Sequence, residues 1–314
     1  MVVISSTLWY LPKTGWICNK KIYEGLMDKN NSERGLLYIV ATPIGNLEDI
    51  TLRAIRILKE VDLIAAEDTR HTRKLLNAYK ITTSLVSLHE HNEREKSALL
   101  IAKIRGGMNV AYVSDAGTPC VSDPGYHLVS FAQAENIRII PIPGASALIT
   151  AMSAAGISAD NFSFCGFLPA RENKRRLFLE SLKDDERTII FYESPARFLS
   201  TLKDIYEILG NREIVVAREL TKIFEEIKRG EVVDFINSYG ESKIRGEFTV
   251  ILRGVKKTPI SFTDEDIEKK LLLIWDDEDI SLRDAVNQLV EKTGLQKKKV
   301  YNLAVQLRLQ KVNS

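Results

Sequence analysis

The loop that follows the apolar run at residues 110–113 carries the residue types that most clearly suggest a binding site. The run VAYV is typical of a buried parallel strand, and it ends abruptly at Ser114 and Asp115. The residues from there to Gly125 are mostly small, polar or turn-forming, and no bulky side chain stands between Asp115 and Pro119. Open α/β sheets bind ligands in loops at the carboxyl ends of their strands. The pattern favours a ligand lying against exposed backbone, with an ordinary strand-to-helix turn as the alternative for Asp-Pro-Gly.

Two common chemistries do not match the motifs around this loop. Gly45 stands alone in TPIGNLEDIT, so residues 42–51 contain neither a GxGxxG pattern nor a Walker loop. Asp123 and His127 suggest a metal pair, but no second carboxylate–histidine pair accompanies them. We therefore expect no phosphate cradle of the usual kinds and no metal site.

Alternating strand-like and helix-like segments would position this loop. Strands are predicted at Leu36–Ala41, Val61–Asp68, Leu85–Glu93, Val110–Val113 and Ile137–Ile142, and a tight turn, Pro143–Ala147, leads from the last one into a small-residue helix. This alternation predicts a mostly parallel sheet covered by helices on both faces. Further strands are predicted at Arg187–Ser194, in the run ending near Arg218, and at Gly246–Arg253, and they indicate a second α/β domain.

The chain divides into four predicted parts. Residues 1–34 lack clear periodicity and are expected to be a disordered extension, with residues 1–26 upstream of a sensible start at Met27. Residues 35–156 and 160–255 are the two α/β domains, and residues 262–314 form a small helical module. Within that module, the spacing of apolar residues predicts a helix-turn-helix. Its interior residues are Ala285 and Val286 in the first helix and Val300, Leu303 and Ala304 in the second, with Gly294 at the turn.

Composition excludes several classes of protein. The 314 residues are 45% hydrophobic and 27% charged, as in ordinary globular proteins, with a net charge of +2, so any basic surface for nucleic acid must be local. No apolar run reaches the roughly 18 residues of a membrane span, so no membrane partner is expected. Three scattered cysteines (Cys18, Cys120 and Cys165) suit a reducing cytoplasm better than a disulfide framework.

Seven motifs, in a fixed order, resemble a known family. They are ATPIGNLEDIT, AAEDTRHTRKLL, SDAGTPCVSDPG, PIPGASA, GFLPAR, FYESPAR and ARELTK. Spread over residues 35–254, they resemble the ribosomal small-subunit RNA methyltransferases that modify a cytidine 2′-hydroxyl, a branch of the tetrapyrrole methylase-like superfamily. The C-terminal module is also similar to the helical tail of that branch.

The resemblance implies a fold, a cofactor and partners. It implies two α/β domains of the tetrapyrrole methylase type with S-adenosylmethionine (SAM) in the cleft between them, a homodimer, and small-subunit (16S) rRNA or the assembled small subunit as substrate. It assigns cofactor binding to Pro43, Asp115, Ala116, Gly117, Thr118, Ser146, Ala147, Tyr192 and Glu247. Thr42-Pro43-Ile44-Gly45 departs from the several glycines of the superfamily's usual first loop.

A ribose 2′-hydroxyl is a poor nucleophile, so a base or a neighbouring cation should help to remove its proton. Glu67 and Asp68, at the end of a predicted strand with Arg70 beside them, are the catalytic candidates. Asp68 has a second interpretation as the cap of the following helix. His89 and His91 are further base candidates, although histidines in polar loops are more often simply exposed.

RNA binding requires local basic surfaces, because the net charge is small. The candidate residues come from three runs: Arg70, Arg73 and Lys74; Arg171, Lys174, Arg175 and Arg176; and Lys297, Lys298 and Lys299. The last run heads the second helix of the predicted helix-turn-helix, where a phosphate could also meet the helix N-terminus. The alternative for each run is a solvated face, and for the tail a module that only packs.

Two other function classes stay open at this stage. A methylase of the same fold could act on a tetrapyrrole precursor, but a small substrate needs neither the helical tail nor the basic helix after Asp68. An RNA-binding assembly factor could also keep the cleft without catalysis, in which case it should ignore SAM.

Overall fold

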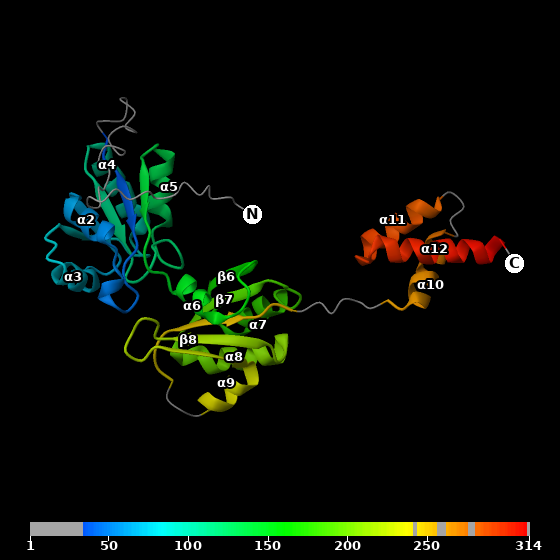
Figure 1. The fold of residues 1–314 in the computed structure, drawn as a ribbon. Coiled ribbons are helices and arrows are strands. Elements are labelled where there is room, and N and C mark those ends of the chain that lie inside the picture. The colour runs from blue at the N-terminus through cyan, green and yellow to red at the C-terminus, as the bar shows by residue number, and fades with distance from the viewer. Residues whose placement is uncertain (1–33, 241–243, 256–261, 276–279, 313–314) are drawn as a thin grey trace, which may run out of the picture. The chain divides into compact units, whose positions relative to one another are not determined.

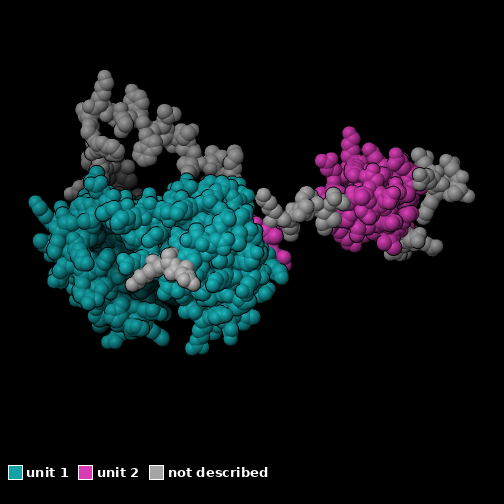
Figure 2. All heavy atoms as spheres, turned by 90° about the horizontal axis from the view of Figure 1, so that it is seen from below, with its two compact units in different colours: residues 1–183, 188–253 teal, residues 184–187, 254–314 magenta. Residues whose placement is uncertain are grey.

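The computed structural model describes residues 34–240, 244–255, 262–275 and 280–312 (Figure 1). The chain forms two compact units, shown in different colours in Figure 2. Unit 1 spans residues 1–183 and 188–253, and unit 2 spans residues 184–187 and 254–314. Apart from Arg34, the predicted N-terminal extension lies outside the described residues.

The first sheet of unit 1 has five parallel strands in the order β3-β2-β4-β1-β5. The strands are β1 (Leu37–Val40), β2 (Leu63–Ala66), β3 (Leu85–Ser87), β4 (Val110–Val113) and β5 (Ile139–Ile142). The accompanying helices are η1 (Leu47–Asp49), α2 (Leu52–Glu60), α3 (Thr69–Ala78), α4 (Glu93–Arg105) and α5 (Tyr126–Ala134). The predicted parallel sheet is confirmed.

Helices cover both faces of this sheet, which explains the continuous apolar runs of its strands (Figure 1). Alternate side chains of β1, β2 and β4 pack with α2 and α3 in one core cluster, and the others pack with α4 and α5 in a second. Every residue of β2 and β4 is buried. All five parallel strands end at the same edge, so the loops after them gather there.

The second sheet of unit 1 is mixed, with order β6-β7-β10-β8-β9; β6 and β7 pair in parallel, and the other pairs between these described strands are antiparallel. The strands are β6 (Phe162–Phe167), β7 (Thr188–Glu193), β8 (Glu213–Arg218), β9 (Glu226–Glu231) and β10 (Phe248–Leu252). Helices α7 (Glu172–Ser181), α8 (Pro195–Leu209) and α9 (Val232–Tyr239) cover one face, and α6 (Ala147–Ala155) packs on the other.

Three elements of this part are not predicted from the sequence. Residues 161–170 interrupt the strand–helix alternation of the sequence, yet they contain β6. The segment EIKRGE forms β9, an edge strand whose side chains are mostly exposed, so it lacks the apolar alternation that marks a half-buried strand. Helix α9 follows it and begins with a capping box between Glu231 and Asp234.

Unit 2 contains helices α10 (Asp264–Trp275), α11 (Leu282–Thr293) and α12 (Lys297–Val312). Their core includes Ile267, Leu271, Val286, Leu289 and the predicted interior residues of α12. Gly294 ends α11 with a left-handed φ of 69°, which glycine adopts without strain. The predicted arrangement of two helices joined by a turn at Gly294 is therefore confirmed. Among the described residues, no helix is long and apolar enough to cross a membrane.

Candidate functional site

A cavity of about 350 Å³ lies within unit 1, with walls from the strand ends of both sheets. The first sheet contributes Ile44, Glu67, Asp115, Ala116, Gly117, Thr118, Val121, Ser122, Asp123, Ser146 and Ala147. The second sheet contributes Phe167, Tyr192, Glu193, Ser194, Pro195, Glu247, Phe248 and Thr249. The cavity thus brings together residues from six of the seven sequence motifs.

The loop after β4 is pinned to the loops after β1 and β5. Thr42 and Gly117 exchange two backbone hydrogen bonds, of 2.8 and 3.0 Å. The Thr118 hydroxyl donates to the Ala145 carbonyl oxygen (3.2 Å). Gly117 has a φ of +81°, a region that side-chain-bearing residues rarely adopt. This wall of the cavity is therefore pre-formed backbone.

Two carboxylates link the loops after β2 and β4. The Asp115 backbone N–H donates to Glu67 Oε2 (3.2 Å), and the Asp68 backbone N–H donates to Asp115 Oδ1 (2.9 Å). Each acidic side chain thus fixes the backbone of the opposite loop. Burial raises the pKa of the Glu67 carboxyl, with the negative charge of Asp115 adding to the effect and its N–H opposing it.

Asp123 is a third carboxyl of this wall. Burial raises its pKa to about 6, the negative charges of Glu67 and Asp115 add to the rise, and a hydrogen bond from Ser114 opposes it. A carboxyl whose pKa lies near neutral pH can both accept and release a proton there. The sequence pattern indicated Asp123 only as part of a metal pair. In the described part of the chain, no three His, Cys, Asp or Glu side chains are grouped so as to hold a metal ion.

The N-terminus of α6 opens toward the cavity. Within the described residues, the Ser146 hydroxyl makes no capping hydrogen bond, although Ser146 is the N-cap and lines the wall together with Ala147. The Leu148 backbone N–H donates to the Tyr192 hydroxyl oxygen (3.2 Å), so a side chain of the second sheet reaches this helix end. Free N–H groups at a helix start favour a negatively charged ligand group.

Asp68 and Arg70 do not belong to the wall formed by the described residues. Asp68 is the N-cap of α3 and accepts from the Arg70 backbone N–H (2.8 Å), and the Arg70 guanidinium forms an ion pair with its carboxylate (2.7 Å). These contacts hold the pKa of Asp68 well below its usual range, because they favour the charged form. Contacts that favour the charged form make this carboxylate a weak proton acceptor, which supports the capping interpretation of Asp68. The catalytic role of Asp68 and Arg70 stays a prediction.

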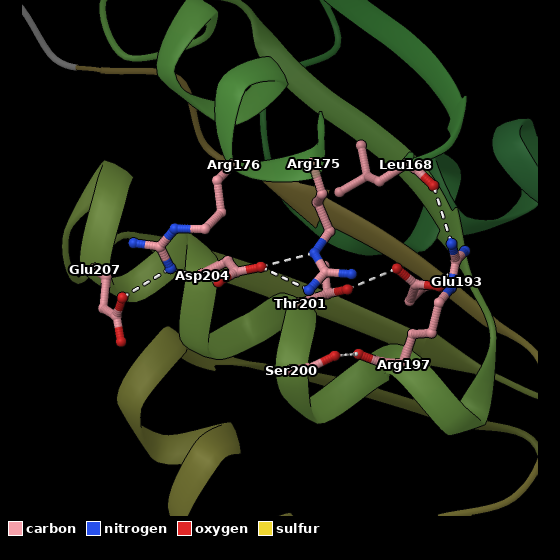
Figure 3. Close-up of polar contacts among 9 residues, drawn as sticks. All are labelled: Leu168, Arg175, Arg176, Glu193, Arg197, Ser200, Thr201, Asp204 and Glu207. Carbon is pink, nitrogen blue, oxygen red and sulfur yellow. Dashed lines mark hydrogen bonds and ion pairs between the residues drawn. The ribbon is translucent and has the colours of Figure 1, made fainter. Parts of the chain in front are cut away.

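The prediction that Arg175 binds RNA is wrong. Arg175 is 3% exposed, and its guanidinium is bonded to the Asp204 carboxylate of α8 (2.7 Å), as Figure 3 shows. It cannot reach a phosphate group. Arg176 is partly exposed and bridges Asp204 and Glu207, so its charge is already paired. Arg171 and Lys174 of the same run are exposed.

The other predicted basic residues lie on exposed surfaces. Arg73 and Lys74 line an open depression on α3 together with Thr69, Arg70 and Asn77. In unit 2, Lys297, Lys298 and Lys299 form the exposed first turn of α12, and the Lys299 ammonium bridges to Asp264 (2.7 Å). Of the two histidines considered as bases, His91 is exposed and His89 is hydrogen-bonded to Asn92.

The cavity also contains residues that sequence reasoning did not select. In the first loop the wall includes Ile44 and, among the described residues, not Pro43. Phe167 and Glu193 line the cavity from the motifs GFLPAR and FYESPAR. Glu193 ends β7, a strand that the sequence predicts, so the rule that ligands bind at strand ends could have found it. Phe167 ends β6, which the sequence does not predict.

These features match a known family. Residues 36–235 match the model of the tetrapyrrole (corrin/porphyrin) methylases, and the chain belongs to that family. Family membership agrees with the SAM dependence that the sequence resemblance implied.

Several curated relatives of this chain share one name. A protein named "Ribosomal RNA small subunit methyltransferase I" from Halalkalibacterium halodurans is 46% identical over 283 residues, covering 88% of this chain and 96% of the relative. Proteins of the same name from Synechocystis sp. and Escherichia coli O157:H7 are 46% and 44% identical, covering 87% and 88% of this chain and 98% and 96% of the relatives.

Solved structures share the fold at lower identity. A cobalt precorrin-4 methyltransferase superposes with a TM-score of 0.54 at 19% identity, covering 73% of this chain and 98% of that one. Diphthine synthase gives 0.56 at 14% identity, covering 70% and 90%. These likenesses support the fold of unit 1.

The cavity has the groups that SAM requires. Ala116 and Gly117 line the cavity with small side chains or none, which admits close approach of a flat adenosine to the backbone, and the α6 N-terminus suits the carboxylate of the methionine part. The carboxylates of Glu67 and Asp115 complement its ammonium and sulfonium charges. The residues present therefore fit the cofactor.

Proposed function

We propose that this protein transfers the methyl group of SAM to the ribose 2′-hydroxyl of a cytidine in small-subunit rRNA. The substrate class is inferred from the similarity of this chain to proteins named for small-subunit rRNA methylation. This similarity extends over 88% of the chain. The part of the chain that this match leaves uncovered is shorter than the helical module at residues 262–314. The matched region therefore includes part of that module. A small-molecule methylase would not need such a module.

The carboxyl groups of the cavity support a hydroxyl as the methyl acceptor. Bound SAM supplies an electrophilic methyl group on a sulfonium, so the reaction needs no metal. A hydroxyl must lose a proton as its oxygen forms the new bond to carbon, whereas a ring nitrogen with a free lone pair needs no proton acceptor. Asp123 and Glu67 are half-buried carboxyls with raised pKa values, and both face the cavity.

We assign to Asp123 the role of accepting the proton of the 2′-hydroxyl. Glu67 already accepts the Asp115 N–H, and this bond fixes the loop after β4. Asp123 is more deeply placed, with a pKa of about 6, so it is largely ionised at neutral pH and ready to accept a proton. Asp115, Glu67 and the α6 N-terminus then orient the donor, and alignment alone can lower the barrier by several kcal/mol.

The decisive experiment maps ribose methylation in rRNA from cells that lack the protein. Loss of one 2′-O-methyl cytidine from the small-subunit rRNA, restored by the wild-type gene, is the expected result. Unchanged methylation would refute the proposal. Isothermal titration with SAM and its demethylated product then separates an enzyme from a binding module, because a non-catalytic assembly factor should bind neither.

Asp115→Ala should weaken SAM binding by about tenfold or more, because it removes a cavity carboxylate and the acceptor of the Asp68 N–H. Isothermal titration measures the SAM dissociation constant, and filter binding measures RNA affinity, which should change little. Asp115→Asn is the matched control: it keeps an oxygen acceptor and separates the loop bond from the charge. Equal loss of SAM and RNA binding would indicate misfolding instead.

Lys297→Ala/Lys298→Ala should reduce RNA affinity and lower the slope of log K against log salt by about 1–2, since each phosphate contact contributes about 0.7–0.9. Lys299 is left intact because it bridges to α10. The charge-matched control, Lys269→Ala/Lys292→Ala, alters exposed lysines of α10 and α11. An unchanged slope in the first variant would leave the helical unit with a packing role only.

The homodimer that the resemblance implied and the cytoplasmic location that the cysteine pattern indicated stay predictions. Sedimentation of the purified protein tests the first, and fractionation of cells tests the second.

A further inference from the structure

Phe167 is an aromatic side chain in an unusual place: it lines the cavity, yet it is 55% exposed. It is the last residue of β6. Large apolar side chains at a binding cavity are normally covered, so an open aromatic ring there has a face available to a ligand arriving from solution.

The strand geometry fixes the direction of this ring. The pairing of β6 with β7 shifts register between Phe164 and Phe167, a β-bulge in the strand. Gly166 within the bulge has a φ of +59°, and a Cβ atom there would lie 2.8 Å from the Ser122 hydroxyl oxygen. Only glycine therefore permits this close approach of the bulge to the loop after β4.

A ring contact and a neighbouring backbone contact hold Phe167 in place. Its ring packs on Tyr192 in a T-shaped pair, with centroids 5.6 Å apart. The next residue, Leu168, is buried, and its carbonyl oxygen accepts from the Arg197 guanidinium (3.1 Å), which also pairs with buried Glu193 (2.6 Å) (Figure 3). The ring is pre-organised while remaining exposed.

We propose that the Phe167 ring is the platform on which the base of the target nucleotide stacks when its ribose enters the cavity. This inference rests on the proposed function, because it takes the substrate to be RNA. Proteins that act on single nucleotides splay the base out of its neighbours and stack it on aromatic side chains. The backbone of the loops that follow the strands of the first sheet is left to hold the cofactor.

Steady-state kinetics with small-subunit RNA and isothermal titration with SAM test this role. Phe167→Leu keeps an apolar side chain but removes the aromatic face, so KM for RNA should rise about 10- to 100-fold with the SAM dissociation constant unchanged. Phe167→Trp keeps the stacking face and should stay within about threefold of wild type. Phe162→Leu, at the other end of β6 and outside the cavity wall of the described residues, is the control and should change neither quantity.

The outcomes separate the two proposals. An active wild-type enzyme whose KM for RNA is unchanged by Phe167→Leu overturns the stacking role alone. A rise in the SAM dissociation constant with an unchanged KM for RNA also overturns it, and would place the adenine of SAM on the ring. A wild-type enzyme that methylates neither the RNA nor the assembled small subunit overturns the proposed function and this inference together.

Discussion

Asp123→Asn should lower kcat for RNA methylation by about 10²- to 10⁴-fold, the usual contribution of a positioned general base. Asparagine keeps the size and hydrogen-bonding capacity of the side chain but cannot accept the proton of the 2′-hydroxyl. SAM binding should change far less than kcat, because the loop bonds of Asp115 and Glu67 remain. Single-turnover kinetics on small-subunit RNA, with titration of SAM, measures both.

The pH dependence of kcat/KM provides the specific signature, because this quantity reports the pKa values of the free enzyme. Because the carboxylate form of Asp123 is the active one, kcat/KM should rise with pH through about 6 in wild type, and this inflection should be absent in Asp123→Asn. Asp160→Asn, an exposed aspartate at the start of the second sheet, is the control. If Glu67→Gln removes the inflection and Asp123→Asn keeps it, Glu67 is the acceptor and the assignment is wrong.

Stability measurements test whether Asp123→Asn loses activity only because it unfolds. The pKa of Asp123 rises from 3.8 in the unfolded chain to about 6 in the fold, so the folded state binds the proton more tightly. Unfolding free energy contributed by this group therefore decreases as pH rises between those two values. Asp123→Asn removes this penalty, so at pH 7 the variant should be at least as stable as wild type in urea.

Much of the fold could be predicted because its parallel strands are buried on both faces. Such strands appear in the sequence as short continuous apolar runs, and each run ends in a polar loop. Since parallel strands end at one edge, the loops that begin at Ser114 and Pro143 could be grouped from their place after these runs alone. The edge strand β9 could not, because its side chains are mostly exposed and carry no periodic apolar signal.

The parts of the site that could not be predicted depend on which way side chains point. In the run RENKRR, four basic residues look alike, but Arg175 lies one helical turn before buried Leu179 and shares its face of α7. Asp123 differs from other loop aspartates only through its burial next to Glu67 and Asp115. Phe167 depends on a bulge in β6, which no local pattern reveals.

Asp204→Ala should destabilise the protein by about 3–5 kcal/mol, the usual cost of leaving one partner of a buried ion pair without the other. The side chains of Arg175 and Asp204 are only 4% and 7% exposed, and their bond joins α7 to α8 (Figure 3). Without the carboxylate, the Arg175 guanidinium is a buried charge that water cannot solvate. Urea denaturation followed by circular dichroism measures the loss, and hydrogen exchange should increase in α7 and α8.

Two further variants establish the cause. Glu207→Ala removes the exposed partner of Arg176 and should cost only about 0–1 kcal/mol, because water screens and solvates the remaining charge. Arg175→Met/Asp204→Leu removes both buried charges and should recover most of the stability that Asp204→Ala loses. Equal losses in Asp204→Ala and Glu207→Ala would contradict burial as the cause. A double variant as unstable as Asp204→Ala would instead attribute the loss to packing, since no unpaired charge would then remain between the two helices.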